Sequence, residues 1–158
     1  MQYEISEAQS KAARHPHEIF LINLITNHIL LFVAALSVAS SYPFLLLPIP
    51  VISAVITTYL LVRARMSHKR DPWFVKCHWQ LAAKRSRMFL IMLAIMAAAV
   101  VVLLLASGGD PGPQHWALGG AAMLPTMVTV LALIVMESDA MHQARHGMVP
   151  KWLVERFP

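Results

Sequence analysis

The sequence predicts an all-α integral membrane protein: four transmembrane helices in an antiparallel bundle, with both termini cytoplasmic. Of its 158 residues, 58% are hydrophobic and only 13% are charged, whereas an ordinary soluble chain is about 45–50% apolar. The charged residues gather in short segments that are separated by long uncharged stretches. The cationic residues occur only in alternate segments. A chain of this length forms one domain, residues 1–158.

Four stretches without Asp, Glu, Lys or Arg are long enough to cross the roughly 30 Å hydrocarbon core of a bilayer. They are Ile19–Ala39, Pro43–Val62, Met88–Ala106 and Trp116–Met136. The first contains asparagines and a histidine, and the second contains Pro48 and Pro50, whereas the third is almost purely aliphatic. We therefore expect four membrane spans, of which the third is the most apolar.

The distribution of Lys and Arg predicts the orientation. Segment Arg63–Arg87 holds eight of the 13 cationic residues, and the amino-terminal segment and the carboxy-terminal tail hold the rest. Loops Ser40–Tyr42 and Ser107–His115 hold none. Because cationic loops stay on the cytoplasmic side during insertion, we expect both termini and the loop 63–87 to be cytoplasmic. The distribution is typical of a multi-pass protein of the bacterial cytoplasmic (inner) membrane.

Two further helical elements are expected in cytoplasmic segments, one before the first span and one before the third. Residues Tyr3–Arg14 favour a short polar helix that ends near Pro16. Asp71 followed by Pro72 favours a helix start, and the helix from there runs into the third span. Its early part, within the loop 63–87, is amphipathic and is expected to lie along the lipid headgroups.

The end of the chain is also marked by its residues. The last long helix is expected to pass the membrane surface and reach about His146, because Gly147 and Pro150 favour its termination. The closing segment Lys151–Pro158 has the pattern of a short amphipathic tail.

Polar residues in the first span predict a contact between helices. At 100° per residue, six of its residues fall within about 40° of one line; they are Asn23, Thr26, Asn27, Leu30, Ala34 and Ser37. Polar groups in a bilayer need protein partners. His28 also lies within this span, where a histidine ligates haem, relays protons or bonds a neighbouring helix. Since no second histidine lies at matching depth, we favour an interhelical hydrogen bond.

Histidines near the cytoplasmic surface favour a second hypothesis, a metal site. Asp139, His142 and His146 are three and four residues apart, so they share one face of a helix. His15 and His17 lie at the same membrane surface. A carboxylate and imidazoles suit zinc or iron, so a divalent metal is the cofactor to test. A solvated polar helix end is the competing interpretation.

Basic residues of the middle loop are expected to contact lipid headgroups; they are Arg63, Arg65, Lys84, Arg85 and Arg87. The net charge of +5 is then explained by topology and by attraction to anionic lipid, and nucleic acid is not an expected partner. The lone Cys77 allows no internal disulfide bond and is consistent with a reducing compartment.

No enzyme motif stands out in the sequence: it has no Gly-rich phosphate loop and no nucleophile elbow. We therefore favour a non-enzymatic membrane module that self-associates or docks as an accessory subunit in a larger membrane complex. The Asn23 and Asn27 line and the basic loop would be its contact surfaces. Alternatives are the metal site, with a redox or hydrolytic role, and a homo-oligomeric pore lined by Asn23, Thr26 and Asn27.

Overall fold

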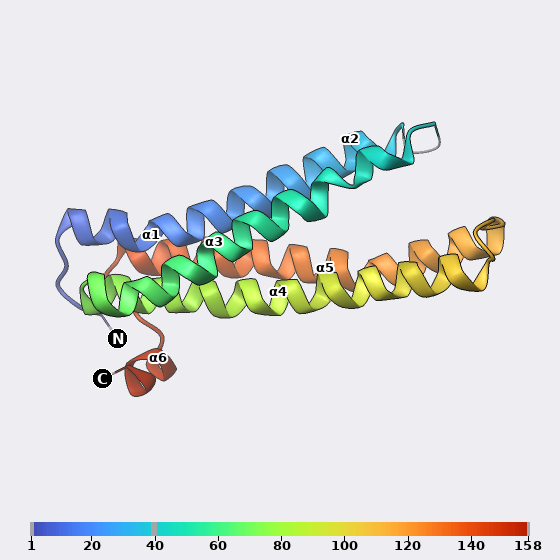
Figure 1. Ribbon diagram of the computed structural model, residues 1–158. Coiled ribbons are helices and arrows are strands. Elements are labelled where there is room, and N and C mark those ends of the chain that lie inside the picture. Colours follow the sequence, from blue (N-terminus) through green and yellow to red (C-terminus); the bar gives the residue numbers. More distant parts are fainter. Residues whose placement is uncertain (1, 39–40, 158) are drawn as a thin grey trace.

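The computed structural model describes residues 2–38 and 41–157, which are almost entirely helical (Figure 1). The elements in chain order are α1 (Glu7–Ile22), the π-helix η1 (Asn23–Leu31), α2 (Phe32–Leu36), the 3₁₀-helix η2 (Pro43–Leu46), α3 (Pro48–Arg70), α4 (Trp73–Ala106), α5 (Pro113–Arg145) and α6 (Lys151–Arg156). The described residues form no β-strand, and Gln2 and Met148 make one isolated bridge.

Four helical stretches are long and apolar enough to cross a membrane: Glu7–Leu36, Phe44–Arg70, Trp73–Ala106 and Pro113–Arg145. This confirms the prediction of an all-helical, multi-pass membrane protein. Each stretch overlaps one predicted span. The first stretch ends at Leu36, before the predicted end at Ala39, which lies outside the described residues, and the second begins one residue after the predicted start at Pro43. Helix α4 has 34 residues, or roughly 50 Å at 1.5 Å per residue, so it extends well beyond the hydrocarbon core.

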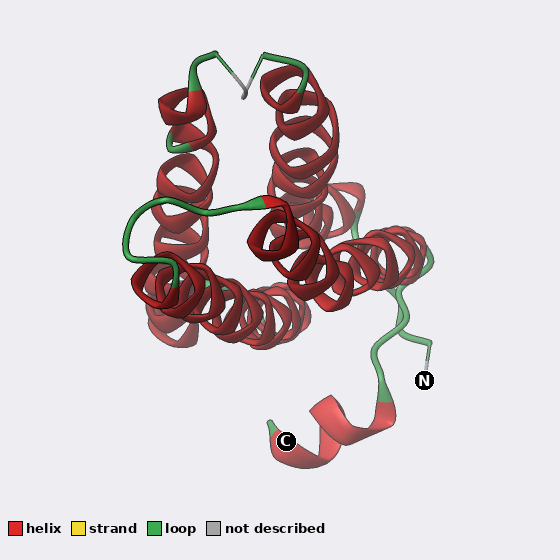
Figure 2. Ribbon diagram, turned by 90° about the vertical axis from the view of Figure 1, so that its right-hand side faces the viewer, coloured by secondary structure: helices red, strands yellow, loops and turns green. Residues whose placement is uncertain are grey.

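Both chain ends and the turn between α3 and α4 lie at one end of the molecule (Figure 1). We call this the charged end, and it comprises residues 2–18, 63–87 and 137–157, which hold all 13 Lys and Arg. The helices pack together there. Away from the charged end, the pair formed by α2 and α3 diverges from the pair formed by α4 and α5, as both views show (Figures 1 and 2).

Helix α1 does not end near Pro16, and the prediction of a separate polar helix was wrong. A capping box starts α1: Gln9 N donates to Ser6 Oγ at 3.2 Å, and Ser6 N donates to the Gln9 side chain at 3.1 Å. Pro16 then lies inside the helix, where it removes one backbone donor. Its neighbours Ala13, His17 and Phe20 are buried. Packing of this face against α4 and α5 offsets the lost hydrogen bond.

The π-helix η1 changes which residues of the first span face the protein. Its i→i+5 hydrogen bonds widen the turn, so positions extrapolated at 100° per residue rotate away from the expected line. Asn23 and Asn27 are buried together with their neighbours Leu24 and His28. The remaining members of the predicted line, Thr26, Leu30, Ala34 and Ser37, are exposed.

The segment before the third predicted span was expected to lie along the headgroups and instead forms the most buried part of α4. Helix α4 begins at Trp73, directly after Asp71 and Pro72, and continues into the apolar span without a break. Eleven of its residues between positions 74 and 89 are buried. They pack against α1, α3 and α5, because this segment has large apolar residues on several faces. Beyond residue 89 the helix is largely uncovered.

The two chain termini meet beside the end of α5. Gly147 follows α5 with a φ of +66°, and the N–H of Tyr3 donates to its carbonyl at 2.8 Å. Met148 N donates to the carbonyl of Gln143 at 2.8 Å. Helix α5 therefore ends where the sequence predicts. Helix α6 is held by the buried side chain of Leu153 and by a hydrogen bond from Trp73 Nε1 to the Phe157 carbonyl.

Gly147→Ala should destabilise this junction. A Cβ at position 147 would collide with the Tyr3 carbonyl, and positive φ costs a non-glycine residue about 1–3 kcal/mol. We expect a lower melting temperature in detergent, followed by circular dichroism. Gly112→Ala is the matched control, because Gly112 has a φ of −72° and a Cβ there would make only an ordinary contact with the His115 ring, at 3.9 Å. Equal melting temperatures for the two variants would contradict the close packing of Gly147 against the Tyr3 backbone.

Candidate functional site

A carboxylate with no exposure to solvent lies at the centre of the charged end. Glu137 of α5 is 0% exposed, as is His17 of α1. Nδ1 of His17 lies 2.6 Å from Oε2 of Glu137, and Nη1 of Arg85, on α4, lies 3.1 Å from Oε1. Because an ionised carboxylate only accepts hydrogen bonds, both nitrogen atoms donate to Glu137. We call Glu137, His17, Arg85 and His78 the buried ion network.

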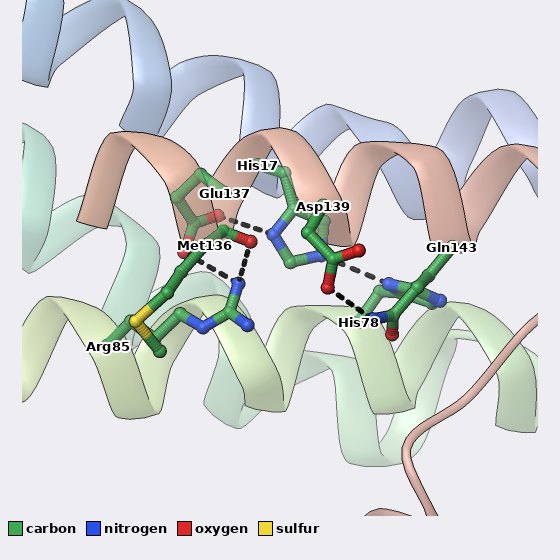
Figure 3. A network of polar contacts seen from close by, with 7 residues as sticks. All are labelled: His17, His78, Arg85, Met136, Glu137, Asp139 and Gln143. Atoms are coloured by element: carbon green, nitrogen blue, oxygen red, sulfur yellow. Dashed lines mark hydrogen bonds and ion pairs between the residues drawn. The ribbon is translucent and has the colours of Figure 1, made fainter. Parts of the chain in front are cut away.

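The buried ion network joins three helices that are far apart in sequence (Figure 3). Nη1 of Arg85 also donates to the Met136 carbonyl at 2.9 Å. Nε2 of His17 lies 3.0 Å from Nδ1 of His78. The ring of Phe74 packs on His78 with centroids 4.8 Å apart. Helix α4 supplies His78 and Arg85, α1 supplies His17, and α5 supplies Glu137 and the carbonyl.

The charges of the network compensate one another. Burying a single ion costs several kcal/mol, and an ion pair with further hydrogen bonds repays most of that cost. Both oxygens of Glu137 have partners on different helices, so the pair fixes how α1, α4 and α5 pack. The 3.0 Å contact between the two histidines is a hydrogen bond in which one ring nitrogen donates to the other. Since His17 and Glu137 are 0% exposed, a substrate has no access to them in this conformation.

A second polar layer lies deeper in the first span and holds it against α3. Nδ2 of Asn23 donates to Ser53 Oγ at 3.0 Å, and Nδ2 of Asn27 donates to the Ile49 carbonyl at 2.8 Å. Nε2 of His28 lies 2.8 Å from the same Ser53 Oγ. The expected interhelical hydrogen bond of His28 is therefore present. Thr26, which was grouped with these residues, is exposed.

The turn between α3 and α4 is closed by a third polar contact. Arg63 and Asp71 form a bidentate ion pair, with N···O distances of 2.7 and 2.8 Å, and the Arg63 guanidinium lies 4.7 Å from the Trp79 ring centroid. Nε2 of Gln80 donates to the Ala64 carbonyl at 2.6 Å. Bidentate geometry and ring stacking are the arrangements that Arg favours.

The structure does not bring the five residues of the predicted metal site together at one point. His17 contacts Glu137 and His78, while the ring of His15 packs edge-on against Trp79. On the exposed end of α5, the rings of His142 and His146 lie 4.1 Å apart, and Asp139 accepts a hydrogen bond from Gln143. No group of three or more His, Cys, Asp or Glu is arranged to hold a metal ion within residues 2–38 and 41–157. The metal site stays a prediction.

The five residues expected at lipid headgroups also separate. Arg85 points into the protein and is only 9% exposed, because Glu137 needs a buried counter-ion. Arg63 pairs with Asp71. Arg65 is exposed. The Lys84 ammonium lies 3.9 Å from the Trp152 ring centroid of α6. Lys84 and Arg87 both line a groove between α4 and α6.

From the sequence, His78 was not singled out, Arg85 was assigned to lipid headgroups, and Glu137 was not placed at the centre of a site. One signal was present. His78 and Arg85 are seven residues apart, so they lie on one face of a helix together with apolar residues. Their charged or polar character on a buried face required partners, but the sequence did not show that α1 and α5 would supply them.

No protein-family model matches this chain, and neither a curated protein nor a solved structure matches it. The geometry alone therefore carries the functional argument below.

Glu137→Gln should destabilise the protein strongly, because it leaves Arg85 buried without a counter-ion. Breaking one partner of a buried pair costs about 3–5 kcal/mol. We expect a clearly lower melting temperature of the full chain in detergent, measured by circular dichroism. Asp139→Asn is the control, since it removes a carboxylate from the exposed face of the same helix, and it should change the melting temperature little.

A double variant makes the test specific to the pair. Glu137→Leu combined with Arg85→Leu removes both charges, so its loss should be smaller than the sum of the two single losses. Additive losses would show that the two side chains do not interact.

Proposed function

We propose that the chain is a non-enzymatic integral membrane module that assembles with other transmembrane helices, first of all with a second copy of itself. The contact face lies on the outer half of α5, where five exposed residues share one side of the helix; they are Ala117, Gly120, Ala121, Leu124 and Val128. We call this set the α5 face. Small residues let helices in a bilayer approach closely.

Gly120 is the observation that carries the proposal. Within a helix, glycine is about 1 kcal/mol less favourable than alanine. At the neighbouring Gly119, a Cβ would make an ordinary contact with the Leu103 side chain, at 3.8 Å. A Cβ at Gly120 would meet nothing within 4 Å. Because Gly120 has no side chain, a helix of another subunit can approach α5 closely at this position.

The uncovered outer half of the molecule supports assembly as well. Only 6% of the most apolar window of α4, and 17% of that of α5, is buried. The two helix pairs diverge there (Figure 2), so the outer halves have few partners within the chain. The polar groups of the first span, by contrast, are already bonded to α3.

Because Asn23 and Asn27 are already bonded to α3, the proposed contact surface is the α5 face and not the line of Asn23 and Asn27. The same bonding also weakens the alternative of a homo-oligomeric pore, because Asn23 and Asn27 donate inside the chain and only Thr26 of the expected pore lining is exposed. A redox or hydrolytic metal site at the cytoplasmic surface is less supported than assembly, since no three of its residues are arranged to hold a metal ion within the described part of the chain.

We further propose that the charged end is cytoplasmic, that successive spans are antiparallel, and that the protein resides in a bacterial inner membrane. All 13 Lys and Arg lie at the charged end, and Asp110 is the only residue between positions 88 and 136 that is Asp, Glu, Lys or Arg. This asymmetry is the one that sets topology during insertion.

Gly120→Leu should weaken self-association in lipid. A leucine in a close helix contact costs about 1–3 kcal/mol, which lowers the association constant roughly five- to hundredfold. Energy transfer between fluorescently labelled copies of the full chain in liposomes, measured across protein-to-lipid ratios, reports the constant.

Ala98→Leu is the matched control, because it makes the same small-to-large change on an exposed position of α4. It should leave energy transfer unchanged. Wild-type chains that stay monomeric at every ratio would contradict self-association, and an equal effect of both variants would contradict the α5 face.

Labelling from one side of the membrane tests the proposed topology. In a Cys77→Ala background, Lys69→Cys and Lys151→Cys should react with a membrane-impermeant thiol reagent only from the cytoplasmic side, and Ser107→Cys only from the opposite side. Cys77 is 0% exposed, so its replacement removes the one native thiol without opening the surface. Reaction of positions 69 and 151 from opposite sides would overturn the topology.

A further inference from the structure

A groove of about 360 Å³ lies between α4 and α6 at the charged end. One part of its wall is cationic, formed by Lys84, Arg87 and Arg156. Another part is apolar, formed by Met88, Ile91 and Trp152. None of the described residues that line the groove is acidic.

The cationic and apolar parts follow one another along α4. Lys84 and Arg87 precede Met88, where the uncharged span begins, and Ile91 lies one turn further. Positions 84, 87, 88 and 91 fall on one face of the helix. From Lys84 to Ile91 the helix rises roughly 10 Å at 1.5 Å per residue. With the charged end at the membrane surface, as proposed above, the groove runs from the headgroup region into the hydrocarbon core.

The cationic side chains are held in place. The Lys84 ammonium lies 3.9 Å from the Trp152 ring centroid, and Arg87 Nε donates to the Ala83 carbonyl at 3.4 Å. The two Nη groups of Arg87 supply further donors, which suit a phosphate oxygen pair. Leu153, 1% exposed, fixes α6 against the bundle. Ile91 is 60% exposed, so the apolar end is open to lipid.

We propose that this groove binds one anionic phospholipid, with its phosphate at Lys84, Arg87 and Arg156 and the start of an acyl chain on Met88 and Ile91. The occupant is a membrane lipid because the groove is both cationic and apolar and because it crosses the membrane boundary. Tryptophan at the headgroup level, here Trp152, is favoured in the same zone. The site combines basic residues from two elements that are 60 or more positions apart in sequence.

Native mass spectrometry of the full chain in detergent tests the site by counting bound lipid during titration with phosphatidylglycerol. The triple variant Lys84→Gln, Arg87→Gln and Arg156→Gln should bind about a hundredfold more weakly, if each basic residue contributes about fivefold. Single variants Arg87→Gln and Arg156→Gln should each lose about fivefold, which gives a result even if the triple variant fails to fold.

The control triple variant is Lys69→Gln, Arg70→Gln and Arg145→Gln, which removes the same charge from exposed positions outside the groove. It should bind phosphatidylglycerol as the unchanged chain does. Neutral phosphatidylcholine should bind weakly to all chains, and an excess of inorganic phosphate should not displace phosphatidylglycerol. Equal losses for both triple variants, equal binding of the two lipids, or displacement by free phosphate would each overturn the proposal.

Discussion

The buried carboxylate of Glu137 is the constraint on which the rest of the structure depends. A charge without exposure to solvent has to be neutralised within the protein. Here Arg85 supplies the opposite charge from α4, and His17 adds a hydrogen bond from α1. The packing of α1, α4 and α5 is therefore specified by hydrogen-bond geometry as well as by apolar contact. Apolar packing alone would specify it poorly, because a bilayer solvates apolar side chains as well as a protein core does.

This constraint acts at the charged end, and the packing of the helices differs between the charged end and the outer half. Near Glu137 the helices are joined by polar contacts at several depths, including the layer of Asn23, Asn27 and Ser53. Farther out, apolar surfaces of α4 and α5 lie uncovered and the helix pairs diverge. A tightly packed charged end and an outer half with uncovered apolar surface suit a module that assembles with other helices. The proposed lipid groove at the charged end is compatible with such assembly, because it lies between α4 and α6 and not on the α5 face.

Composition and charge placement were sufficient to predict the four membrane helices, because bilayer thickness sets their length and polarity directly. The end of α5 just before Gly147 was likewise predicted from a local signal, because Gly147 has a positive φ. Where tertiary contacts override local preference, prediction failed: packing carries α1 through Pro16, and the π-helix turns Thr26 and Leu30 outward. The buried ion network was not predicted, since it needs the relative placement of three helices. Arg85 was assigned to lipid because it lies within a basic run, Lys84 to Arg87, and only the position of Glu137 distinguishes it.

The central claim is that Glu137 holds His17 in a solvent-excluded hydrogen bond. Nitrogen-15 NMR of the histidine-labelled full chain in lipid tests it most directly. We expect a strongly deshielded, slowly exchanging Nδ1 proton on His17, consistent with its 2.6 Å contact, while the ring protons on the nitrogens of the exposed His142 exchange rapidly with water. A His17 side chain that exchanges as fast as His142 would contradict it.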